Sequence, residues 1–119
     1  MASSRPTHRI AAPLANQFDS ALTARLREVV AGGSVTETEL RELIEQADGW
    51  ARTLEARVEA GERTLAKLTA DPAGSMVEIA DELRRVEMLR PELEEVRRLL
   101  ADLETRAREL RAGWLRAGK

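Results

Sequence analysis

Apolar residues recur along this chain with the spacing of amphipathic α-helices. From Thr36 to Ala70 they advance in strictly alternating steps of four and three residues, which is the period of a coiled-coil seam. A single long helix over about 36–70 is therefore predicted. The members of this stripe are Leu40, Ile44, Ala47, Ala51, Leu54, Val58, Gly61, Leu65 and Leu68.

A second long stripe predicts a helix over about 75–116 and contains one additional step of three. Its members are Ile79, Leu83, Val86, Leu89, Leu93, Val96, Leu100, Leu103, Ala107, Leu110 and Trp114. When the two stripes are laid antiparallel, the residue numbers of facing positions add up to 147 in every pair except Leu65 with Leu83. The all-α fold expected from this agreement is a long antiparallel helical hairpin, or coiled-coil stalk, within one chain.

Local signals mark the ends of both helices. Two pairs have the spacing of a capping box, in which each side chain accepts a hydrogen bond from a backbone N–H: Thr36 with Glu39, and Ser75 with Glu78. The segment 71–74 contains Pro72 and predicts the turn between the helices. Pro91 falls within the second stripe, and because the stripe continues past it we expect one helix with a kink near Pro91.

A shorter helix is predicted over about 17–31, ended by the glycine pair Gly32-Gly33. Its stripe consists of Phe18, Leu22, Leu26 and Val29. The 36–70 helix carries a second apolar margin at Leu43 and Trp50. We therefore expect the short helix to fold onto the base of the hairpin and to cover Trp50.

Residues 1–15 contain two prolines and no acidic residue, which predicts a flexible arm before a single helical domain over 16–119. An organelle-targeting peptide is the alternative interpretation of this arm, and Pro6 and Pro13 argue against it because each would interrupt a targeting helix.

The composition narrows the classes of protein that the chain can represent. Nineteen basic and twenty-one acidic residues leave a net charge of −2, which disfavours coating of nucleic acid through bulk charge. Cysteine is absent, which excludes disulfides and thiol catalysis. Apolar runs stay far shorter than the about 18 residues of a membrane span. A cytoplasmic protein is expected.

Residue patterns that carry catalysis or cofactor chemistry are missing from the sequence. His8 is the single histidine and lies in the predicted arm, and neither a Glu-x-x-His motif nor a glycine-rich phosphate loop occurs. We therefore expect no enzyme activity, no cofactor and no metal.

The candidate contacts with a partner or a second copy are Trp114, Leu115, Leu110, Arg111, Arg116 and Gly61. Trp114 lies on the second stripe at a position where the 36–70 helix has no residue left to face it. Tryptophan often anchors interfaces. The basic residues around it either compensate the helix dipole or form, with Trp114 and Leu115, an anchor for an acidic protein, a membrane surface or nucleic acid. Gly61 either permits close helix approach opposite Val86 or forms a notch for a partner side chain.

These features favour a noncatalytic helical interaction protein, such as an adaptor, assembly factor or scaffold component, that binds another protein and itself as a homodimer or four-helix bundle. The alternative is a nucleic-acid-binding regulator in which the 17–31 helix, its turn and the next helix form a helix-turn-helix. The acidic start of that next helix, Thr36-Glu37-Thr38-Glu39, argues against the alternative. A third class would bind a lipid or a nucleotide messenger between the helices.

Overall fold

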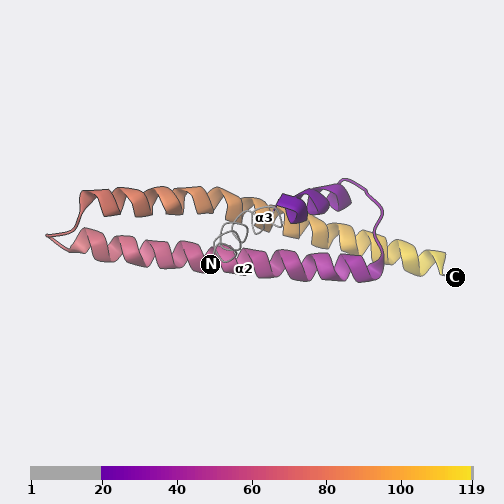
Figure 1. The fold of residues 1–119 in the computed structure, drawn as a ribbon. Helices are drawn as coiled ribbons and strands as arrows, with labels where there is room; N and C mark the ends of the chain where they lie inside the picture. The colour runs from indigo at the N-terminus through magenta and orange to yellow at the C-terminus, as the bar shows by residue number, and fades with distance from the viewer. Residues whose placement is uncertain (1–19, 119) are drawn as a thin grey trace, which may run out of the picture. The chain divides into compact units, whose positions relative to one another are not determined.

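The computed structural model describes residues 20–118, and within this range all regular structure is helical. A first helix is described over residues 20–30, α2 spans Glu37–Ala70 and α3 spans Met76–Ala117 (Figure 1). The all-α fold class predicted from the sequence is confirmed. The predicted arm at 1–15, which includes His8, and the predicted start of the first helix lie outside the described residues.

The chain divides into two compact units. We call Glu45–Ala101 the central unit, and residues up to Ile44 together with Asp102–Lys119 the terminal unit. Both long helices contribute to both units, since α2 passes position 44 and α3 passes position 101 without interruption. The helix α3 also continues through Pro91.

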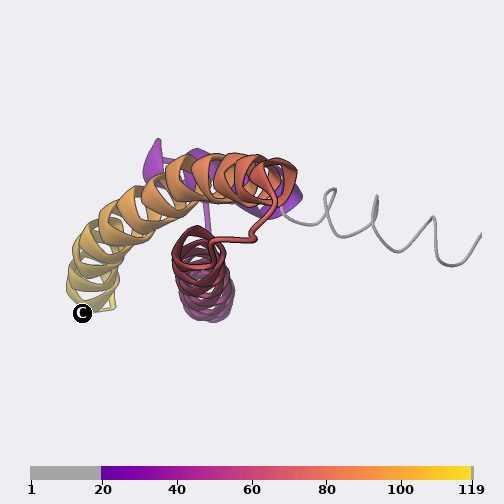
Figure 2. The same cartoon turned by 90° about the vertical axis from the view of Figure 1, so that its left-hand side faces the viewer.

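In the central unit, the segments of α2 and α3 run side by side in opposite directions (Figures 1 and 2). Their shared core consists of Ala51, Leu54, Val58, Val86, Leu93 and Val96, with Trp50, Leu65 and Leu89 packed against it. Two ion pairs join the helices beside this core, Glu55 with Arg97 and Glu62 with Arg90. The two pairs are seven residues apart on each helix, which is the spacing of a heptad register.

A compact turn connects the two helices of the central unit. The backbone N–H of Gly74 donates to the carbonyl of Asp71 at 2.9 Å, and that of Ala73 donates to the Asp71 carboxylate at 3.0 Å. The hydroxyl of Ser75 accepts the N–H of Glu78 at 3.3 Å and so caps α3, which is the first half of the predicted capping box.

The prediction that Leu83 belongs to the core is wrong, because this side chain is 45% exposed. Val86 packs so closely on Gly61 that its Cγ2 lies 2.5 Å from where a Cβ of residue 61 would stand. The residue that accompanies Val86 on this inner face is Glu82, whose side chain is largely buried and pairs with Arg85 at 2.7 Å. Residues four apart share a helix face, so Glu82 turns inward and Leu83 turns outward.

Three helical segments form the core of the terminal unit. Its buried side chains are Leu22, Leu26 and Val29 from the first helix, Leu40 and Leu43 from α2, and Leu103 and Ala107 from α3. Leu43, which belongs to the predicted second margin of α2, is more deeply buried than Ile44, which belongs to its main stripe. The buried face of α2 here is therefore wider than a single coiled-coil seam.

The turn between the first helix and α2 has the geometry that its sequence predicts. Gly32 adopts a φ of 111°, and the N–H groups of Gly32 and Gly33 donate to the carbonyls of Val29 and Glu28 at 3.1 and 2.9 Å. This is a Schellman end, which needs a left-handed residue and hence favours glycine.

The predicted capping box at the start of α2 is confirmed in both of its hydrogen bonds. The N–H of Glu39 donates to the Thr36 hydroxyl at 3.1 Å, and the N–H of Thr36 donates to the Glu39 carboxylate at 3.0 Å. Arg25 of the first helix also lies 3.6 Å from Glu39, so this carboxylate joins the two helices.

Candidate interaction surfaces

The terminal unit brings together several of the residues predicted to contact a partner. Arg111 of α3 forms a two-point ion pair with Glu37 in the first turn of α2, with Nε donating at 3.0 Å and an Nη2 donating at 3.1 Å. Guanidinium and carboxylate match in this geometry, which makes such pairs more specific than a single contact. Arg111 therefore directs its guanidinium at a carboxylate of its own chain.

This ion pair also lowers the pKa of the Glu37 carboxyl at the start of α2. The hydrogen bond from Arg111 is the largest cause that holds the pKa of Glu37 below its ordinary value, with a further contribution from Arg41. Hydrogen bonds from Thr36 lower the pKa of Glu39 in the same direction. Both carboxylates therefore stay ionised to a lower pH than an ordinary glutamate.

A shallow cavity of about 330 Å³ adjoins the ion pair and is lined by Glu37, Arg111, Trp114 and Leu115. Leu115 is largely exposed, Trp114 is about one-third exposed and Leu110 is half-buried. Arg116 lies exposed in the last turn of α3. Of the six predicted contacts, only Gly61 belongs to the other unit.

Replacing Arg111 by glutamine is expected to raise the pKa of Glu37 toward its ordinary value, because the strongest donor to the ionised form is lost. A carboxyl-detected NMR titration of Glu37 measures this directly. Replacing Arg41, a smaller cause, by glutamine is the control and should raise the pKa less. Equal shifts in the two variants would contradict the dominant role of Arg111.

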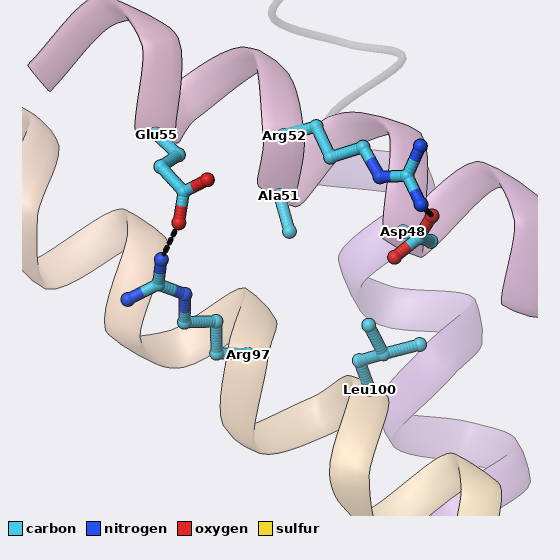
Figure 3. Close-up of a pocket in the computed structure, with 6 residues that line it drawn as sticks. All are labelled: Asp48, Ala51, Arg52, Glu55, Arg97 and Leu100. Atoms are coloured by element: carbon cyan, nitrogen blue, oxygen red, sulfur yellow. Dashed lines mark hydrogen bonds and ion pairs between the residues drawn. The ribbon is translucent and has the colours of Figure 1, made fainter. Parts of the chain in front are cut away.

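A cavity of the central unit lies beside the paired helices (Figure 3). Its volume is about 260 Å³, and it is lined by Asp48, Ala51, Arg52, Glu55, Arg97 and Leu100. Arg52 pairs with Asp48 at 3.0 Å along α2, and Arg97 of α3 pairs with Glu55 of α2. Every charged side chain that lines this cavity therefore already has a partner of opposite charge.

Gly61 lines another cavity of the central unit, of about 300 Å³, together with Arg57, Ala60, Thr64, Glu82, Arg85 and Leu89. Val86 lies against Gly61, which is the close helix approach that one interpretation of this glycine expects, and the notch for a partner side chain stays a prediction. The neighbouring Trp50, predicted to be core, is half-buried, and the Arg57 guanidinium lies 5.5 Å from its ring centroid.

Sequence reasoning missed the outer face of α3 in the central unit. Four large apolar side chains of α3 in this unit are between 45% and 77% exposed: Met76, Val77, Leu83 and Met88. Val77 and Met88, eleven residues apart, lie on one line of the helix, and Met76 and Leu83, seven apart, lie on another. The sequence carries no apolar stripe here, since the line through Val77 and Met88 also contains the charged residues Asp81 and Arg84.

Within residues 20–118, no three His, Cys, Asp or Glu side chains form a group able to hold a metal ion. No helix in the same range has both the length and the apolar content needed to cross a bilayer. Comparison of the chain with protein-family models, with curated proteins and with solved structures finds no match.

Proposed function

We propose that this chain is a noncatalytic helical interaction protein that associates with itself and acts as an adaptor, assembly or scaffold component. The observation that supports the proposal is the set of four exposed apolar side chains on α3, Met76, Val77, Leu83 and Met88. Full burial of such a side chain contributes about 1.5–3 kcal/mol, so a protein partner that covered them would gain binding energy from each.

The architecture that we propose for this function is a coiled-coil stalk with the short N-terminal helix folded onto its base. The heptad spacing of the Glu55–Arg97 and Glu62–Arg90 pairs supports the stalk. A pair of helices buries only one stripe of each, and packing two such pairs through α3 as a four-helix bundle would bury the outer face of α3 as well.

The alternative hypothesis, a nucleic-acid-binding regulator, has less support. A recognition helix would present the first turn of α2 to the phosphates, and that turn carries Glu37 and Glu39, whose pKa values are lowered. A salt-dependent gel shift with random duplex DNA would favour this alternative over the interaction protein.

Sedimentation velocity from low to high micromolar concentration tests self-association. We expect the mass to rise from one chain to at least two, and Met88→Glu to shift the transition to higher concentration because it places a charge on the exposed apolar face. Ala56→Glu, which introduces the same carboxylate at an exposed position of α2, should leave the transition unchanged. A wild-type protein that stays monomeric at the highest concentration would contradict the proposal.

A further inference from the structure

We propose that a second copy of this chain binds the outer face of α3 in antiparallel orientation, with Val77 opposite Met88 and Asp81 opposite Arg84 of the other copy. This inference rests on the proposed self-association, and it specifies the surface, the orientation and the register.

The outer face of α3 carries a seam of its own. Val77, Asp81, Arg84 and Met88 are separated by four, three and four residues, so they follow one line along the helix. Val77 is 69% exposed and Met88 is 72% exposed. The side chains of Asp81 and Arg84 are exposed as well. The opposite face of the same stretch is occupied by the contact between Val86 and Gly61, so the outer seam is free of the intramolecular core.

The order of residues along this seam is complementary to itself. If Val77 lies opposite Met88 of an antiparallel copy, then moving four residues inward from each brings Asp81 opposite Arg84. Two-fold symmetry repeats each contact, so the interface contains two apolar pairs at its ends and two pairs of opposite charge between them. An in-register parallel copy would instead set Asp81 against Asp81 and Arg84 against Arg84, which like-charge repulsion disfavours.

The existing contact between Asp81 and Arg84 does not prevent these side chains from pairing with a second copy. Asp81 and Arg84 pair with each other at 3.3 Å within one helix, and both are exposed. Exposed pairs of this kind contribute little to stability, so breaking the intrahelical pair costs little. In the interface the same groups lose part of their hydration, which lowers the affinity. The seam is short compared with the about 800 Å² per partner of a standard interface, so we expect a weak dimer.

Reciprocal charge reversal tests the register. Asp81→Arg puts two arginines on each seam, and Arg84→Asp puts two aspartates there, so each variant alone repels its own copy. We expect each to raise the dimer dissociation constant about tenfold or more. An equimolar mixture should associate again, because every introduced charge then faces an opposite one. The doubly exchanged chain, with both substitutions, should also associate like the wild type.

Glu59→Arg and Arg63→Glu form the matched control, because both residues are exposed on α2 and the changes in charge are of the same kind. Neither should alter the dissociation constant, and circular dichroism should give the same helical content for every variant. If the wild type dimerises but the reversals have no effect, or the mixture fails to associate, this register is overturned and self-association stands. A monomeric wild type would overturn both proposals.

Discussion

Replacing Leu54 by alanine is expected to lower the free energy of unfolding by about 2–5 kcal/mol, the range for a fully buried leucine. Leu54 is fully buried, in the core between α2 and α3 of the central unit. The core here is only one layer thick, so neighbouring side chains can relax toward the gap, and we expect a value in the lower half of the range. Urea unfolding followed by circular dichroism, at a concentration below self-association, measures the loss.

Leu83→Ala is the control for this experiment, because it removes the same atoms from the same unit at a position that is 45% exposed. We expect it to cost less than about 1 kcal/mol. A neutral Leu54→Ala would contradict the proposed stalk, and equal losses for the two variants would show that Leu83 is a core residue after all.

Exchanging glycine for alanine at two positions of α2 is expected to change stability in opposite directions. At Gly49 an added Cβ would meet nothing within 4 Å, so alanine should stabilise the protein by up to about 1 kcal/mol through helix propensity. At Gly61 the same Cβ would stand 2.5 Å from the Cγ2 of Val86. Val86 is β-branched and stiff in a helix, so it cannot turn away without strain.

We therefore expect Gly61→Ala to cost about 1–2 kcal/mol, because overpacking outweighs the gain in helix propensity. Adding Val86→Ala removes the clashing methyl and leaves the Val86 Cβ at an ordinary distance of 3.9 Å. The double variant should therefore lose less than the sum of the two single losses, as measured in the same urea titrations. Stabilisation by Gly61→Ala would show that the two helices are not in close contact at this point.

Much of the structure could be predicted because its causes act within one or two helical turns. The capping box at Thr36 and Glu39 and the glycine end at Gly32 depend on residues at most five apart. The buried stripe of α2 follows from periodicity alone, since Leu40, Ala47, Ala51, Leu54 and Val58 are all buried as the stripe predicts.

The candidate surfaces were predicted less completely. Trp114, Leu115 and Arg111 do line one cavity, but nothing local indicates that Arg111 pairs with Glu37, which lies 74 positions earlier in the chain. The exposure of Met76, Val77 and Met88 was missed for a similar reason. A sequence shows that a residue is apolar, and only the packed helices show whether another segment covers it.

The sequence by itself determined the helices, their ends and the inner stripe of α2, because hydrogen bonding and hydrophobic periodicity along one helix are local properties. The two stripes already place Val86 opposite Gly61, and tertiary structure decided which residue of α3 accompanies Val86 on the inner face. The absence of a Cβ lets Val86 approach α2 closely, and that contact sets the rotation of α3 so that Glu82 is covered and Leu83 is exposed. The rotation of one helix against another depends on the shapes of both surfaces at their contact, which no single stripe contains.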